Sequence, residues 1–267
     1  LDAQGVLRDD LRLLVMSATL DGAAVARLMG DAPVIESQGR AYPAETRYLG
    51  RHETLRLEDA VVRAIERALA EETGGVLVFL PGQGEILRTA ERLADRLRRD
   101  DVLIAPLYGA LDPKAQDRAV AAPPPGIRKV VLATSIAETS LTLEDVRVVI
   151  DSGQARVPRF DPASGLTRLA TVRVSRAAAD QRRGRAGRTA PGVCYRLWDE
   201  PETRALLAFA DPEILDADLS SLALDMARWG AKSADDLAFL DPPPKAALAE
   251  AQALLRRLEA VERQQVV

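Results

Sequence analysis

The stretch GGVLVFLPGQGEI, residues 74–86, decides the fold class, because it places an apolar strand, a glycine-rich turn and a helix start in direct succession. The strand is almost continuously apolar, as in sheets that are covered on both faces. The helix is predicted from Glu85 to about Arg99, with an apolar face of Ile86, Leu87, Ala90, Leu93, Ala94 and Leu97. A strand that turns into an amphipathic helix is typical of a βαβ unit.

Other apolar runs extend this pattern. KVVLATS (129–135) and VRVVIDSG (146–153) predict two further strands, and LRLLVMSATL (11–20) predicts a buried strand that runs into Ser17. Because these strands alternate with helical patterns, we predict an α/β fold with a parallel sheet and flanking helices. From about Pro201 onward helical patterns dominate, which predicts a small helical domain.

Three helix starts are marked by capping residues. Asp112 and Asp211 each precede a proline, the pattern of an acidic N-cap before proline at the first helical position. Ser175 is a plausible cap for a helix that continues through residue 188.

The composition of the 267 residues excludes several classes of protein. One cysteine allows no internal disulfide framework and fits a reducing cytoplasm, and one histidine argues against a common zinc site or a Ser/His/Asp triad. No apolar run approaches the roughly 20 residues of a membrane helix, and no signal peptide is visible. The chain does not begin with methionine, and we expect both ends to be cuts through a longer polypeptide.

Positive charge is concentrated in one region of a chain whose net charge is -4. Between Arg147 and Arg188 there are ten arginines and three acidic residues. Within this region, QRRGRAGR (181–188) places Gln181, Arg185 and Arg188 three or four residues apart, so that on a helix they share one face. Guanidinium pairs suit the oxygens of a phosphoryl group. This spacing predicts a phosphate site.

The other residues of this segment receive a different interpretation. Arg182 and Arg183 start on other faces, and we predict that they are peripheral, as surface or backbone-contacting charges. Glycine is costly inside a helix, so Gly184 and Gly187 predict a close approach to a neighbouring backbone or to a nucleotide.

A second segment, ATSIAETSLTLEDV (133–146), surrounds the carboxylate of Glu138 with hydroxyl groups. The hydroxyl residues are Thr134, Ser135, Thr139, Ser140 and Thr142. Hydroxyls and main-chain amides at a strand-to-helix turn can bind a nucleic-acid backbone without reading its bases.

Five segments together resemble a known family. They are similar, in chain order, to motifs III, IV, V, Va and VI of the superfamily 2 DEAH-box helicases. The five segments are SAT (17–19), LVFLPGQGEI (77–86), ATSIAETSLT (133–142), VIDSGQ (149–154) and QRRGRAGR (181–188). Residues 41–48, 108–120 and 191–200 are similar to the bacterial HrpB type. The resemblance covers essentially the whole chain.

This resemblance implies two RecA-like domains that bind ATP with Mg²⁺ between them, an RNA track across both, and a winged-helix domain. It divides the chain into a remnant of the first RecA-like domain (1–39), the second RecA-like domain (40–201) and a partial winged helix (202–267). It also implies a β-hairpin at 159–176 that helps to separate strands.

The resemblance also implies roles for individual residues. Gln181, Arg185 and Arg188 would face the triphosphate and the attacking water, with both arginines as arginine fingers. The residues implied near the nucleotide are Ser140, Thr142 and Glu144. Those implied to contact the RNA backbone, without sequence preference, are Thr134, Ser135, Thr139, Tyr108 and Gly82. Ser17 and Thr19 would couple hydrolysis to closure against the first RecA-like domain.

The sequence contains no G-x-x-x-x-G-K-[ST] loop and no D-E-x-H box, which would hold the phosphates and Mg²⁺. We therefore expect the ligands of Mg²⁺ to lie outside these residues and the chain alone to hydrolyse no ATP at a meaningful rate. Two alternatives remain: a non-catalytic RNA-binding or regulatory module, and a DNA-directed helicase of the same superfamily. The expected location is the cytoplasm, with no membrane contact.

Overall fold

The computed structural model describes residues 10–16, 22–36, 42–51, 54–97, 99–138, 143, 145–262 and 265–266. The chain forms two compact units. One consists of residues 39–157 and 170–210, and the other of residues 1–38, 158–169 and 211–267. We call them the sheet unit and the helical unit.

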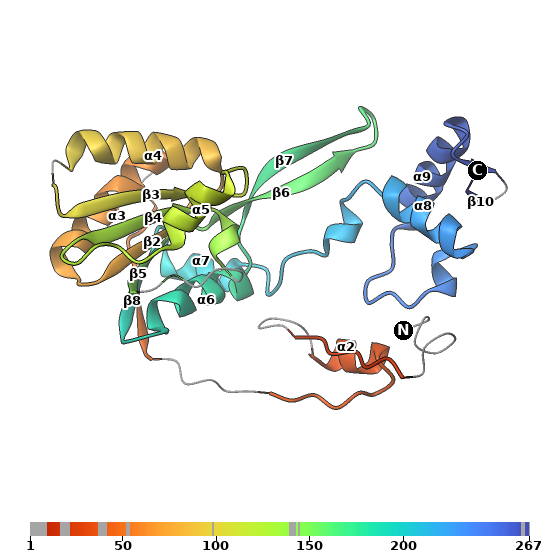
Figure 1. Cartoon of the computed structure of the whole chain (residues 1–267), viewed down its shortest axis with the longest axis horizontal. Helices are drawn as coiled ribbons and strands as arrows, with labels where there is room; N and C mark the ends of the chain where they lie inside the picture. The colour runs from red at the N-terminus through yellow and green to blue at the C-terminus, as the bar shows by residue number, and fades with distance from the viewer. Residues whose placement is uncertain are drawn as a thin grey trace. The chain divides into compact units, whose positions relative to one another are not determined.

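A six-stranded parallel sheet forms the centre of the sheet unit (Figure 1), which confirms the predicted α/β fold class. The strand order is β1-β8-β5-β2-β4-β3. In chain order the strands are β1 (Ala44–Tyr48), β2 (Gly75–Phe79), β3 (Val102–Leu107), β4 (Arg128–Ala133), β5 (Val146–Asp151) and β8 (Gly192–Arg196). The central strand β2 is buried along its whole length, as its continuous apolar run predicts.

Helices cover both faces of this sheet. On one face, α3 (Leu57–Glu71) and α4 (Gln83–Arg96) pack apolar side chains such as Val61, Ile65 and Leu93 against the sheet. The other face is covered in part by α5 (Pro113–Val120) and by a 3₁₀ turn, η2 (Arg185–Gly187). Asp112 caps α5 as predicted, since its Oδ1 accepts from the Ala115 amide at 3.0 Å.

The remaining helices of the sheet unit are α6 (Arg176–Gly184) and α7 (Glu200–Ala205). Ser175 caps α6 as predicted, because its Oγ accepts from the Ala178 amide at 3.2 Å. A further 3₁₀ turn, η1 (Ser135–Ala137), directly follows β4.

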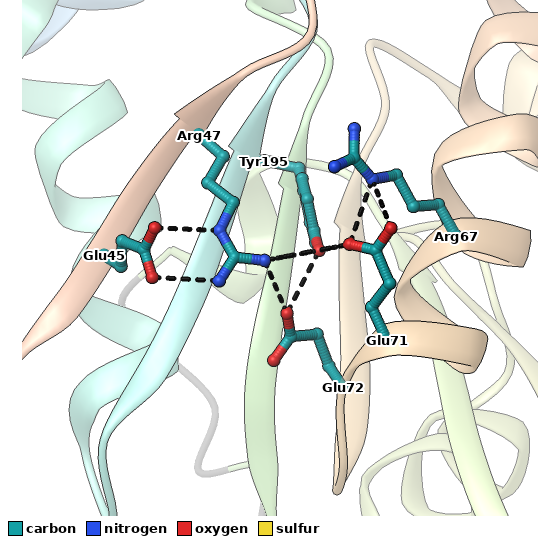
Figure 2. Close-up of polar contacts among 6 residues, drawn as sticks. All are labelled: Glu45, Arg47, Arg67, Glu71, Glu72 and Tyr195. Atoms are coloured by element: carbon teal, nitrogen blue, oxygen red, sulfur yellow. Dashed lines mark hydrogen bonds and ion pairs between the residues drawn. The ribbon is translucent and has the colours of Figure 1, made fainter.

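A polar cluster ties the edge of the sheet to the end of α3 (Figure 2). Arg47 Nη1 on β1 donates to Glu72 Oε1 at 2.6 Å and to the Tyr195 hydroxyl on β8 at 3.1 Å. That hydroxyl in turn lies 3.2 Å from a carboxylate oxygen of Glu71 and of Glu72. The arrangement fixes the edge strand β1, which among the described strands pairs only with β8.

The helical unit has its own small core. Helices α8 (Ser220–Trp229) and α9 (Lys245–Arg257) pack through Ala223, Met226, Leu248 and Leu255. Helix α2 (Gly22–Leu28) also belongs to this unit. The unit also contains two 3₁₀ turns, Glu213–Leu215 and Ala234–Asp236, and the two-residue strands β9 (Val261–Glu262) and β10 (Gln265–Val266).

A two-stranded sheet is formed by β6 (Gln154–Asp161) and β7 (Leu166–Arg173), joined by a turn at 162–165 (Figure 1). It corresponds to the β-hairpin that the resemblance implies at 159–176.

Outside the segment 181–188, three sequence predictions about local structure are wrong. Residues 11–16 form no strand, and Leu14, Val15 and Met16 are exposed, because no described strand pairs with this segment. Asp211 caps no α-helix: a 3₁₀ turn of three residues follows, without a side-chain cap. The strands β9 and β10 interrupt the region where only helices were predicted.

Candidate functional site

Four of the predicted RNA-contacting residues lie at one edge of the sheet. Gly82, Tyr108 and Thr134 follow the carboxyl ends of β2, β3 and β4 respectively, and Ser135 begins η1. The parallel register brings these ends together: the Thr134 amide donates to the carbonyl of Leu107, the last residue of β3, at 3.3 Å. Ligands of open α/β sheets bind at this edge.

The predictions for Ser17, Thr19, Thr139, Ser140, Thr142 and Glu144 concern positions outside the described residues. The structural account of the site therefore rests on the turn at 134–138 and on the segment 181–188.

The segment 181–188 is not one continuous helix, contrary to prediction. Helix α6 ends at Gly184, and the chain tightens into the 3₁₀ turn η2. Tightening of this kind is frequent at helix ends. Gln181 is half-buried, Arg185 is buried and Arg188 is exposed. The three side chains therefore differ in their access to a ligand.

Arg185 is held by the turn that follows β4. Its Nε donates to the main-chain carbonyl of Glu138 at 2.9 Å. Burial, reinforced by the charge of Arg188, lowers the pKa of Arg185 to about 10. The guanidinium remains protonated at neutral pH, and the effect of Arg188 on this pKa places a second positive charge near it. Such a pair attracts an anion.

Arg182 is not peripheral, contrary to prediction, although it makes the main-chain contact that the prediction allowed, from its Nη1 to the carbonyl of Gln154. Its side chain is fully buried, and its guanidinium contacts two carboxylates. Nε donates to Glu138 Oε1 at 2.8 Å, and Nη1 donates to Asp151 Oδ1 at 2.7 Å. The guanidinium also lies 4.9 Å from the ring centre of Phe79. Sequence spacing missed this residue, although the carboxylates of Glu138, shortly after β4, and Asp151, at the end of β5, were a signal of a buried cation.

Arg183 is peripheral, as predicted. Its side chain is half exposed, and the ion pair found for it joins Nη2 to Asp180 Oδ1 at 3.9 Å within α6. A pair of this kind on a helix surface contributes little to stability. Arg183 is therefore a suitable control for the arginines of the site.

The two glycines of the segment differ. A Cβ at Gly187 would lie 2.3 Å from the carbonyl oxygen of Tyr42, so the predicted close approach to a neighbouring backbone is present there. A Cβ at Gly184 would meet no described atom within 4 Å. At Gly184 the close approach to a backbone is therefore absent among the described residues, and the alternative, a close approach to a nucleotide, stays a prediction.

Arg156, on β6, is a further residue that sequence reasoning missed. Its Nη2 donates to Glu85 Oε1 at 3.0 Å, and its Nη1 would lie 2.4 Å from a Cβ at Gly82. The absence of a side chain at Gly82 thus admits a guanidinium beside the turn after β2. Arg156 adds a positive charge to the edge that carries Tyr108 and Thr134.

The described residues contain no group of three or more His, Cys, Asp or Glu side chains that could hold a metal ion. No helix among them is long and apolar enough to cross a membrane. The thiol of Cys194 is buried, and burial raises its pKa to about 12, so it is not a nucleophile at neutral pH.

Comparison with known proteins agrees with the motifs. Residues 58–190 match the model of the helicase conserved C-terminal domain. The chain is 49% identical to the ATP-dependent RNA helicase HrpB of Escherichia coli over 262 residues, which are 98% of this chain and 32% of the relative. It is 39% identical to the pre-mRNA-splicing factor ATP-dependent RNA helicase prp22 of Schizosaccharomyces pombe, over 96% of this chain and 22% of the relative.

A crystal structure of the Escherichia coli DEAH/RHA helicase HrpB superposes with a TM-score of 0.92 at 48% identity, and the match covers all of this chain and 34% of that one. The chain belongs to the DEAH/RHA helicases, and residues 58–190 are its helicase C-terminal domain. Within that family it is of the HrpB type. It spans about a third of the length of these HrpB relatives.

Proposed function

We propose that this chain is the arginine-bearing and RNA-contacting part of an ATP-dependent RNA helicase. The observation that carries the proposal is the position of Arg185, whose buried guanidinium donates to Glu138 beside the exposed Arg188. The same turn carries Thr134 and Ser135. The segment 181–188, proposed for a phosphoryl group, is therefore hydrogen-bonded to the turn 134–138, proposed for a polynucleotide backbone.

Arg185 and Arg188 would stabilise the negative charge that spreads over a transferring γ-phosphoryl group, a contribution of about 10³–10⁵ in rate. Gln181, four residues before Arg185, would orient the attacking water. Burial of Arg185 favours this role, because a charge–charge interaction is stronger in a poorly hydrated site. Its hydrogen bond to Glu138 holds the guanidinium in place before the nucleotide arrives.

RNA would be held through its backbone and without sequence preference. Thr134 is half-buried and Ser135 is exposed, and hydroxyl and amide groups of this kind contact phosphates and sugars. Gly82 and Tyr108, at the ends of neighbouring strands, would extend the same track, with Tyr108 receiving a hydrogen bond from Gln83 Nε2 at 3.4 Å.

Mg²⁺ bound with ATP would neutralise charge on the phosphates. We infer that its ligands come from residues outside this chain. We also propose that the chain consists of a remnant of the first RecA-like domain (1–39), a second RecA-like domain (40–201) and a partial winged helix (202–267). The proposed location of the protein is the cytoplasm. Residues 1–267 alone should then show no ATP hydrolysis above buffer, even with RNA added.

The function is tested by measuring ATP hydrolysis of the full-length protein with RNA and with single-stranded DNA of the same sequence. The proposal predicts hydrolysis that RNA stimulates more than DNA does. Equal or greater stimulation by DNA would favour a DNA-directed helicase. No hydrolysis under any condition would favour a non-catalytic RNA-binding or regulatory module.

A further inference from the structure

Arg182 lies where the carboxyl ends of several strands meet. Phe79 ends β2, Asp151 ends β5, and Glu138 directly follows η1 after β4. All three contact the Arg182 guanidinium, as described above. Arg182 Nη1 also donates to the carbonyl of Gln154, the first residue of β6, at 3.2 Å. One side chain from α6 thus joins four segments of the sheet edge.

Glu138 is the point at which the two halves of the proposed site meet. Its carboxylate accepts from Nε of Arg182, and Oε1 lies 2.8 Å from Nη2 as well. Its main-chain carbonyl accepts from Nε of Arg185. The turn behind it is closed by two main-chain bonds, from the Glu138 amide to Ser135 and from the Ala137 amide to Thr134. A shift of Thr134 or Ser135 therefore moves the group that holds Arg185.

We propose that Arg182 is a positioning residue that couples RNA at the turn 134–138 to the placement of Arg185 at the nucleotide. This inference rests on the proposed function. By fixing the Glu138 carboxylate against Asp151, the guanidinium makes the turn and η2 move as one body. It contacts neither RNA nor nucleotide, so its effect appears in the linkage between the two ligands.

The geometry requires arginine at this position. A planar guanidinium can donate to Glu138 through one edge and to Asp151 through another nitrogen, whereas an ammonium has no fork of fixed geometry. Lysine would preserve the buried charge and lose this simultaneous alignment. Arg182→Lys therefore removes the positioning. The lysine still supplies a positive charge to the buried carboxylates, which limits the loss of stability.

The test measures the dissociation constant of the full-length protein for single-stranded RNA, with and without a saturating non-hydrolysable ATP analogue. Linkage between two sites changes affinity by about 5- to 150-fold in typical cases. We expect the ATP analogue to change the RNA affinity of the wild type by a factor in this range, and that of Arg182→Lys by less than about two-fold. Without the analogue, Arg182→Lys should bind RNA as tightly as the wild type. The matched control is Arg183→Lys, which should keep the wild-type linkage.

A purely structural role would lower the melting temperature of Arg182→Lys and leave the linkage factor unchanged, and that result would overturn the inference. Should the lysine variant not fold, Glu138→Ala serves in its place, since it removes the side chain through which Arg182 holds the turn and keeps the main-chain carbonyl that accepts from Arg185. A wild-type linkage factor in folded Glu138→Ala would also overturn the inference. Absence of RNA and nucleotide binding in the wild type would instead contradict the proposed function itself.

Discussion

Gly187 lies directly against the backbone of Tyr42. The Tyr42 amide donates to the Gly187 carbonyl at 2.8 Å, and the carbonyl oxygen of Tyr42 occupies the space in which a Cβ of residue 187 would stand. This contact joins η2, which carries Arg185, to the segment that leads into β1. The position of the arginine turn is therefore set by packing as well as by hydrogen bonds.

Gly187→Ala should destabilise the protein by about 1–3 kcal/mol, because a backbone cannot yield as a flexible side chain does. It should also reduce ATP hydrolysis through the displacement of Arg185. The matched control is Gly184→Ala, three residues earlier, where a Cβ would meet open space. In a helix, alanine stabilises the folded state by up to about 1 kcal/mol relative to glycine. Thermal unfolding and ATP hydrolysis of the two full-length variants check this contrast. Equal effects of both changes would contradict it.

Gly82→Ala should weaken RNA binding with a stability cost of less than about 1 kcal/mol, because the atoms in its way belong to the movable side chain of Arg156. Displaced from Gly82, Arg156 would lose its hydrogen bond to Glu85 and its place beside the proposed track. The measurement is RNA affinity of Gly82→Ala, Arg156→Ala and the double variant. If Gly82→Ala and Arg156→Ala both act through the Arg156 side chain, the double variant should bind RNA no more weakly than Arg156→Ala alone. Additive losses would exclude this explanation.

The buried carboxylate of Glu138 predicts a pH dependence of stability. Burial raises the pKa of Glu138 above its ordinary value of 4.5, although Arg182 opposes the shift. The folded state then binds the proton more tightly than the unfolded state. The contribution of this proton to the free energy of unfolding is fully present below about pH 4.5. It is lost as the pH rises through the pKa that Glu138 has in the folded state.

Glu138→Gln carries no titrating group at this position. The stability of the variant relative to the wild type should therefore increase as the pH rises from about 4 to about 8. Urea unfolding of both full-length proteins across this range measures the difference. A difference that is constant, or that moves in favour of the wild type, would contradict the raised pKa.

The fold was predictable where apolar runs determine it, and less so where tertiary partners do. Strands β2, β4 and β5 follow from continuous apolar runs, and the Asp112 and Ser175 caps from local chemistry. Residues 11–16 have the same apolar character and form no strand. A single sequence segment does not reveal whether a hydrogen-bonding neighbour is present.

The candidate site was predictable in its residue types and not in their orientation. Spacing by three and four assumes a continuous α-helix, whereas the chain tightens at Arg185. Arg185 is buried and Arg188 is exposed, a difference that the spacing does not predict. Helical spacing predicted a peripheral Arg182 because spacing takes no account of charge. The fold brings the carboxylates of Glu138 and Asp151 to the same guanidinium, although they are far apart from it in the sequence. Charge compensation is thus a better guide to a buried arginine than helical position.

The most direct test of the proposed function is RNA-stimulated ATP hydrolysis by the full-length protein carrying Arg188→Ala, compared with Arg183→Ala in the same segment. Arg188 is exposed beside the buried Arg185, whereas Arg183 pairs with Asp180 on the surface of α6. We predict that Arg188→Ala lowers the rate by about 10³-fold or more and that Arg183→Ala stays within about two-fold of the wild type. Near-normal hydrolysis by Arg188→Ala would contradict the assignment of this segment to the ATP site.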